Sequence, residues 1–348
     1  MKMTKIKTGA AVFAAGILLL GSTESLAAAQ SAVYGFWKSF LPAMLPFFLL
    51  APYLTGPDAQ EVFSAVFGRV FPALFRVPGR GAGAVICGWI AGSPAGCAAC
   101  AAAGEGMHAG EYARMCGLAS GLSPAFLITA VGSGYLGDAQ AGGMLFASHI
   151  GAVLMGGILL RKWEPGDVLP ENRGEAARQD IFARAMANMG RVLCWMVVFS
   201  VLCALAEQRL GRWMPEWVFA PVCEISGGAA ALAEAELSRE VKMVLLSLCT
   251  GFGGVCVLMQ NAQASGLRVR TLLGPKILHG ALSAGLTALM LRAGEIPLPE
   301  IPGEADVFGA AVYAAVGLAA LVATGGWARR KNRVDGGLLR PYTDTKAQ

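Results

Sequence analysis

The chain has 348 residues, of which 55% are hydrophobic and only 15% are charged. A soluble domain of ordinary composition carries about 25% charged residues, so these proportions exclude a typical water-soluble globular protein. The net charge of +5 does not indicate nucleic acid as a partner, because the basic residues lie in short clusters between apolar segments, as in membrane proteins. We therefore expect an all-α polytopic membrane protein with about 7–9 transmembrane or re-entrant helical segments.

Residues 1–30 predict an N-terminal membrane helix or a signal-peptide-like segment. Three lysines among the first eight residues precede the apolar run 10–20, and small residues follow at 27–29. A basic start, a short apolar core and small exit residues also fit a cleavable signal peptide. We favour an uncleaved helix, because the next part of the chain is another membrane segment.

Residues 31–162 predict the first of two related halves. Its second apolar segment is cut by the sequence GSPAG at 92–96, and its third is cut by GLSP at 121–124. The fourth is an uninterrupted run close to the length of about 20 residues that crosses a bilayer. The apolar segments of this half lie at 40–54, 81–103, 111–136 and 141–160.

A polar loop at 163–184 separates this half from a second half at 185–292. The apolar segments of the second half lie at 185–206, 217–233, 241–265 and 271–291. Glu224 lies inside the second of these segments, and the sequence GFGG at 251–254 interrupts the third.

The rest of the chain predicts an outer loop with a last membrane helix at 293–327 and a basic tail at 328–348. Lysine and arginine number three in the first eight residues, five at 161–184 and six in the last 21 residues. Because basic residues concentrate on the cytoplasmic side, we expect both termini and the central loop in the cytoplasm. The expected location is the cell (inner or plasma) membrane, crossed several times.

The two halves share an order of elements. Each has a glycine-broken segment and then a glycine-led apolar helix with one histidine, His149 or His279. A helix broken within the membrane leaves N–H and C=O groups that cost several kcal/mol each if they face lipid. Such breaks persist inside protein or beside a wet cavity, and transporters built from repeats use them to bind solutes.

The breaks predict two re-entrant hairpin tips, at 92–96 and 251–254. Pro94 lacks an N–H and disfavours helical geometry at Ser93, and the glycines permit backbone conformations closed to other residues. For the first break the alternative is close helix packing, because a glycine recurs there at every fourth residue from Gly88. The glycines expected at the tips are Gly92, Gly96, Gly251 and Gly254.

The residues expected to contact a polar solute surround these tips. Glu224 is the most informative, because an ionisable group at membrane depth is by default a functional candidate; the alternative is an interfacial glutamate beside a helix end. His149 and His279 are more often packing or hydrogen-bonding groups than ligands. The hypothetical substrate-binding residues are Ser93, Pro94, Ser123, Glu224, Ser226, Gly253, Gln260 and Asn261.

We expect no enzyme, and therefore no catalytic residues, metal ligands or cofactors. The sequence contains no visible Ser-His-Asp constellation or P-loop, and three histidines leave little acid–base equipment. Cys97 and Cys100 have the spacing of redox or metal pairs, but no second pair or nearby histidine completes a site. Seven of the nine cysteines lie in apolar runs, where they serve as small hydrophobic side chains.

Five short segments in this order carry a family resemblance: FLPAMLPFF at 40–48, VPG at 77–79, GSPAG at 92–96, GFGG at 251–254 and LHG at 278–280. The chain resembles the YlbJ family of sporulation integral membrane proteins, which carry the nucleoside-recognition Gate domain. The resemblance implies a fold similar to the core of concentrative nucleoside transporters. It also implies a role in the mother cell in building the spore cortex.

Two functions remain in competition. The first is a sporulation-associated, transporter-like protein for a small polar solute, either nucleoside-like or related to the cortex. The second is a non-transporting membrane scaffold or assembly factor that keeps the Gate fold. The expected partners are the lipid bilayer, the solute, and either a second copy of the chain or other sporulation membrane proteins, with no nucleic acid.

Overall fold

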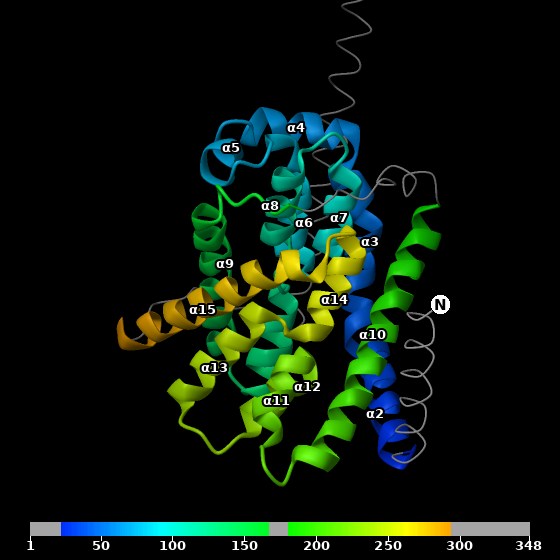
Figure 1. Cartoon of the computed structure of the whole chain (residues 1–348), viewed down its shortest axis with the longest axis vertical. Coiled ribbons are helices and arrows are strands. Elements are labelled where there is room, and N and C mark those ends of the chain that lie inside the picture. Colours follow the sequence, from blue (N-terminus) through cyan, green and yellow to red (C-terminus); the bar gives the residue numbers. More distant parts are fainter. Residues whose placement is uncertain (1–21, 167–179, 294–348) are drawn as a thin grey trace, which may run out of the picture.

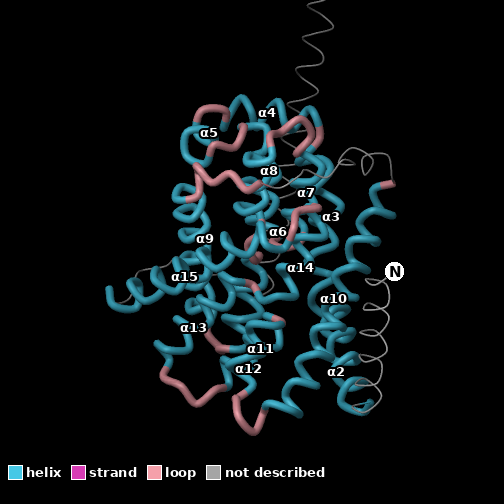
Figure 2. Tube along the Cα trace, in the orientation of Figure 1, coloured by secondary structure: helices cyan, strands magenta, loops and turns pink. Residues whose placement is uncertain are grey.

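A computed structural model describes residues 22–166 and 180–293, and all regular elements in these ranges are helices (Figure 2). The described part of the chain is a helical membrane protein. Three of its stretches are long and apolar enough to cross a membrane: α9 (Ala139–Leu159), α10 (Ile181–Leu210) and the combined segment Arg239–Ser265. The expected N-terminal helix, last membrane helix and basic tail fall largely or wholly outside the described residues.

The N-terminal helices pack around the core and cap one end of the molecule. Two prolines lie inside α3, and α10 packs along α2 (Figure 1). Figure 1 shows α4 and α5 together at the top of the molecule, which we call the α4–α5 end. The elements are α2 (Ser22–Gly35), the π-helix η1 (Phe36–Phe40), α3 (Leu41–Thr55), α4 (Pro57–Phe67), α5 (Val70–Phe75) and the 3₁₀ turn η2 (Gly79–Gly81).

The next five elements form a hairpin, a broken helix and a long helix. α6 (Ala82–Ala91) and α7 (Ala95–Ala103) pack against each other. The residues before α6 lie beside the residues after α7, since a Cβ added to Gly106 would lie 3.7 Å from Arg80 Nη2. The chain then runs through α8 (Ala109–Ala119), a break, the π-helix η3 (Ala125–Tyr135) and α9.

The last elements follow α10 and begin at the other end of the molecule. α11 (Glu216–Cys223) and α12 (Ile225–Glu234) pack against each other and lie at the end away from α4 and α5 (Figure 1). The next pair, α13 (Arg239–Phe252) and α14 (Gly254–Ser265), is separated by one residue, Gly253, and α15 (Val269–Ala293) follows.

Two contacts show that the segment from α13 to α14 runs opposite to the segment from α8 to η3. Arg239, at the start of α13, pairs with Asp138, which follows η3. At the other end, the Tyr112 hydroxyl in α8 donates to the carbonyl of Ser265, the last residue of α14, at 2.7 Å. The two broken segments therefore lie antiparallel and both cross the centre of the molecule.

Close backbone packing holds this centre together. A Cβ on Gly88 or Gly96 would overlap the backbone of Ala119, and a Cβ on Gly251 would lie 2.7 Å from the Gly280 Cα. Small residues allow such approach between membrane helices, where dispersion contacts rather than water exclusion drive association. The packing alternative for the glycine repeat therefore describes Gly88 and Gly96, whereas Gly92 is the turn, with a φ of +76°.

Candidate functional site

The tip of the first hairpin lies against the break between α8 and η3. The backbone N–H and the Oγ of Ser93 both donate to the Gly121 carbonyl, each at 2.8 Å. The Leu122 N–H donates to His149 Nε2 of α9 at 2.9 Å. This bond fixes the neutral tautomer of His149, with the proton on Nδ1. The polar backbone of the break is thus paired inside the protein, as an interrupted membrane helix requires.

Side chains also satisfy the carbonyls at the end of α8. The Ser120 hydroxyl donates to the Gly117 carbonyl at 2.9 Å, and Trp89 Nε1 donates to the Leu118 carbonyl at 3.0 Å. The Ser120 carbonyl accepts from Lys276 Nζ of α15 at 2.9 Å. These are groups that an α-helix leaves without internal partners at its C-terminus.

The tip of the second hairpin lies against the break between α13 and α14. A Cβ on Gly254 would lie 3.3 Å from the Cys223 carbonyl and 3.4 Å from the Ile225 nitrogen. Glu224 forms the turn of this hairpin. Its two carboxylate oxygens accept from the N–H groups of Ser226 (2.9 Å) and Gly227 (2.8 Å), so it caps α12.

Three side chains join the two junctions. Asn261 Nδ2 of α14 donates to Ser93 Oγ at 3.0 Å, and Asn261 is fully buried. His279 Nε2 donates to the His149 carbonyl at 3.0 Å, with the two imidazole centroids 4.3 Å apart. Lys276 contacts the first break and lies beside the second, since a Cβ on Gly253 would be 3.6 Å from its Nζ.

A small, mostly apolar hollow of about 20 Å³ lies beside the first tip, between α3, α7, α10 and α14. Two of its lining residues, Pro94 and Gln260, are among those predicted from the sequence. Trp195 Nε1 donates to Gln263 Oε1 at 2.7 Å, and Arg191 donates to Asn188 Oδ1 at 3.2 Å. The lining residues are Phe48, Pro94, Ala98, Asn188, Arg191, Val192, Trp195, Gln260, Gln263 and Ala264.

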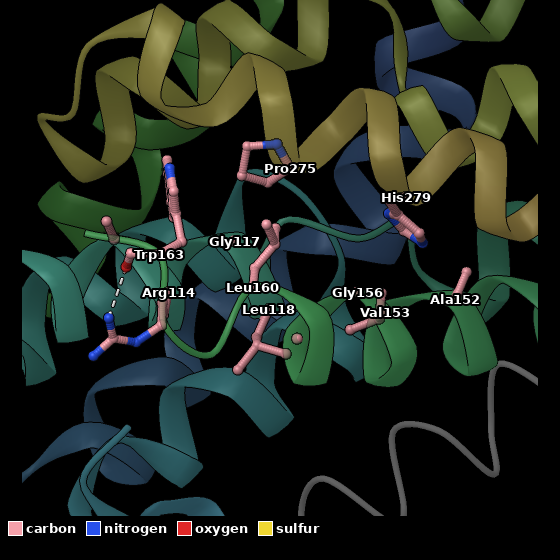
Figure 3. A pocket seen from close by; sticks show the side chains of 12 residues that line it. Arg114, Gly117, Leu118, Ala152, Val153, Gly156, Leu160, Trp163, Pro275 and His279 are labelled. Atoms are coloured by element: carbon pink, nitrogen blue, oxygen red, sulfur yellow. Dashed lines mark hydrogen bonds between the residues drawn. The ribbon is translucent and has the colours of Figure 1, made fainter. Parts of the chain in front are cut away.

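A second cleft, of about 30 Å³, lies between α8, α9 and α15 (Figure 3). Its lining is mostly small and apolar, with Arg114 at one end and His279 at the other. Arg114 is committed to structure: it donates to the Trp163 carbonyl at 2.8 Å and pairs with Glu164 at 2.7 Å. The cleft therefore offers little polar chemistry beyond the one imidazole.

The structure distributes the predicted site residues over the two junctions. Ser93, Ser123, Gln260 and Asn261 lie around the first tip and the facing turns of α14. Glu224, Ser226 and Gly253 belong to the second junction. Gly254, at the start of α14, lies beside the turn at Glu224, and Gln260 lines the hollow six residues further along α14. The second junction therefore lies about 9 Å along α14 from the hollow.

Two predictions about the second half differ from the structure. The segment 251–254 is not a hairpin tip, because α13 and α14 continue one another as a single membrane-crossing stretch, with Gly251 inside α13. The segment 217–233 is not a span but the second hairpin, turning at Glu224. In the first half, Gly96 is not at the turn but is the second residue of α7.

Sequence reasoning missed two charged residues, Lys276, which is buried, and Arg191, which is exposed. Lys276 lies inside the expected span 271–291, and Arg191 lies inside 185–206, about 15 Å along α10 from its first residue. An ionisable residue within an apolar span is a signal of function that could have identified both. It also missed a buried hydroxyl cluster joining α9, α13 and α15, made of Ser148, Ser247, Ser283 and Thr287.

No group of three or more His, Cys, Asp or Glu side chains that could hold a metal ion occurs within the two described ranges. Cys97 and Cys100 are free thiols buried in the core between α6, α7 and α8.

Comparison with known proteins gives one distant relative. The chain is 22% identical to the sporulation integral membrane protein YlbJ of Bacillus subtilis (strain 168), over 84% of this chain and 85% of that protein. No protein-family model matches the chain, and no solved structure matches it. The similarity extends over most of both proteins, which supports a distant relationship between two integral membrane proteins.

Proposed function

We propose that this chain is a sporulation-associated transporter-like protein for a small polar solute, with a core of the Gate type. The association with sporulation rests on the distant similarity to YlbJ, a sporulation integral membrane protein. The transport part of the proposal rests on the arrangement of the helices. A role related to the spore cortex is part of the same proposal and rests on the family resemblance alone.

The proposed core consists of two halves of opposite orientation, at 79–159 and 216–293. Each comprises a hairpin, a broken helix and a long helix, and the two broken helices lie antiparallel. His149 and His279 are each the eleventh residue of their long helix, α9 and α15, and their rings are in contact. Inverted repeats with discontinuous helices are typical of secondary transporters, which bind solutes where the repeats meet.

One observation carries the proposal: the buried contact of Ser93 with Asn261 across the two halves. Asn261 Oδ1 has no hydrogen-bond partner among the described residues, although it is buried. A buried polar atom without a partner costs about 1–3 kcal/mol, so it indicates a site that a polar ligand completes. The hollow that includes Pro94 and Gln260 lies beside the same tip, and neither Ser93 nor Asn261 lines it.

The solute class follows from the lining of the hollow. Amide groups of Asn188, Gln260 and Gln263 offer both donors and acceptors, and the Arg191 guanidinium offers donors only. The Trp195 indole can lie against a planar ring. These groups suit a solute with a ring and several hydrogen-bonding groups, such as a nucleoside, which would enter only if the helices around the hollow of about 20 Å³ move apart.

The test is uptake by purified protein in proteoliposomes, with a panel of radiolabelled nucleosides and amino sugars. We expect uptake of at least one member, and a loss of about 10-fold or more in Asn261→Leu, because one buried hydrogen bond and its ligand partner are removed. Gln60→Leu is the matched control: its amide donates to the Thr55 carbonyl in the α4 region and should leave uptake unchanged. Equal uptake in Asn261→Leu and wild type, or none for any solute, would count against transport at this site.

The scaffold function has one specific observation in its favour. Most polar groups at the two breaks are paired within the protein, and Glu224 uses both carboxylate oxygens to cap α12. If Asn261→Leu accumulates normally and supports sporulation as wild type does, the scaffold is the better account.

A further inference from the structure

Lys276 is a buried lysine in the first third of α15. Its side chain is among the largest fully buried ones, and the residue is 1% exposed. The two ion pairs in the described part of the chain, Arg114–Glu164 and Arg239–Asp138, do not include it. Burying a charge without a countercharge costs several kcal/mol, so the position of this ammonium requires an explanation.

The surroundings of Lys276 explain how the charge is held. Its Nζ donates to the Ser120 carbonyl at 2.9 Å, immediately after the last residue of α8. It also lies beside Gly253, immediately after the last residue of α13. Helix α8 therefore ends at this ammonium, whereas Gly253 both ends α13 and begins α14. Each helix C-terminus carries about half a negative charge, spread over carbonyls that lack internal partners.

This arrangement is the one that membrane transporters use for metal ions. Unwound backbone carbonyls and the C-terminal ends of half-helices coordinate Na⁺ in discontinuous helices. Three titratable residues lie close enough to interact with Lys276: His149, His279 and Cys97. None of them is an aspartate or a glutamate. The Ser120 carbonyl after the last residue of α8 is thus the attractive partner that the contacts provide.

The lysine is not a general requirement of these long helices. In α9 the residue three before His149 is Phe146, whereas in α15 the residue three before His279 is Lys276. Phe146 packs beside an apolar cluster that includes Leu122 and Val257. Only one of the two helices thus places an ammonium at the centre, where the ends of α8 and α13 meet.

We propose that the Lys276 ammonium is a built-in cation, which holds the two helix breaks together in place of a bound monovalent metal ion. This inference goes beyond the proposed function and stands whether or not a solute is carried. It implies that the folded protein needs neither Na⁺ nor K⁺. It also implies that removal of the ammonium creates a site that a small external cation can enter.

The experiment measures thermal unfolding of the purified full-length protein in detergent, in the chloride salts of Na⁺, K⁺, methylammonium, n-butylammonium and N-methylglucamine at equal ionic strength. We expect wild type to unfold at one temperature in all five salts. Lys276→Ala should lose roughly 10- to 100-fold in its folded-to-unfolded ratio in N-methylglucamine, the value expected for a hydrogen bond to a charged group. Na⁺ or an alkylammonium ion should restore part of that loss.

Lys242→Ala is the matched control. Lys242 Nζ also donates to a backbone carbonyl at a helix end, that of Ala233 at 2.7 Å, but it is only partly buried. Its loss should not make stability depend on the cation. Stabilisation of wild type by Na⁺ would overturn the proposal, and so would a folded Lys276→Ala that responds to no cation.

Lys276→Gln keeps the proposal falsifiable if Lys276→Ala does not fold. Glutamine retains a donor for the Ser120 carbonyl but lacks the charge. We expect this variant to be less stable than wild type and to gain stability from small cations. If it equals wild type in every salt, a neutral hydrogen bond suffices and the built-in cation is wrong.

Discussion

The two histidines occupy matching places in α9 and α15, yet they make different hydrogen bonds. His149 Nε2 accepts from the Leu122 N–H, a backbone group of the first break. His279 Nε2 donates to the His149 carbonyl, which lies inside α9 and is part of its helical ladder. We therefore predict unequal effects of His149→Leu and His279→Leu on the free energy of unfolding.

The magnitudes follow from what each substitution leaves behind. His149→Leu leaves the buried Leu122 N–H without a partner, which costs about 1–3 kcal/mol. His279→Leu removes one hydrogen bond to a carbonyl that already accepts in its helix, a loss of about 0.5–1.5 kcal/mol. His149→Gln keeps an acceptor at a similar reach and should recover part of the first loss.

Equilibrium unfolding of the purified variants by SDS in mixed micelles measures these differences. The expected order of stability is wild type, His279→Leu, His149→Gln and then His149→Leu. The reasoning is refuted if the two leucine variants are equally stable, or if His149→Leu is as stable as wild type. A double variant should be destabilised by less than the sum of the single ones, since the rings are in contact.

Three further outcomes follow from the packing. Ser247→Ala removes hydrogen bonds to three hydroxyl groups, each worth about 0.6 kcal/mol in a membrane protein, so SDS unfolding should show a loss of about 2 kcal/mol. Gly96→Val should abolish the folded fraction in size-exclusion chromatography, because a Cβ there meets the Ala119 backbone, whereas Gly190→Val should not, since nothing lies near that Cβ. Arg114→Met should lower the unfolding temperature by more than Glu164→Gln, because Arg114 also donates to two backbone carbonyls and is far more buried.

Much of the fold could be predicted from hydropathy, because a span of about 20 apolar residues is a local property of the chain. The expected segments 141–160 and 185–206 match α9 and α10 closely. The turn at Gly92 was also local, since glycine and proline restrict the backbone wherever they stand. The location of residues outside the described ranges stays a prediction.

The hairpin at 217–233 could not be distinguished from a span, because its length and hydropathy suit both. Gly228 decides it: a Cβ there would meet the Pro221 backbone, so α12 returns along α11. The direction of the chain after the break at Gly253 also depends on residues far away in the sequence. Whether a one-residue break turns the chain back depends on its neighbours, and here α14 continues towards Tyr112, more than 140 residues earlier in the chain.

The partners of the break carbonyls were beyond sequence reasoning for the same reason. Lys276 and Ser120 are 156 residues apart, and Asn261 and Ser93 are 168 apart. Composition indicates that a polar group inside an apolar span needs a partner, but it does not say which one. Asn261 was correctly placed among polar residues near a break, whereas Lys276 was not singled out.

The central claim is that the centre consists of one hairpin from each end and two antiparallel broken helices. Cysteine accessibility from each side of the membrane, on a background without the nine native cysteines, tests it most directly. The account predicts that Glu105→Cys and Arg268→Cys are labelled from one side, and Glu216→Cys and Ser238→Cys from the other. Labelling of Ser238→Cys and Arg268→Cys from the same side would mean that 239–265 turns back within the membrane, and would contradict it.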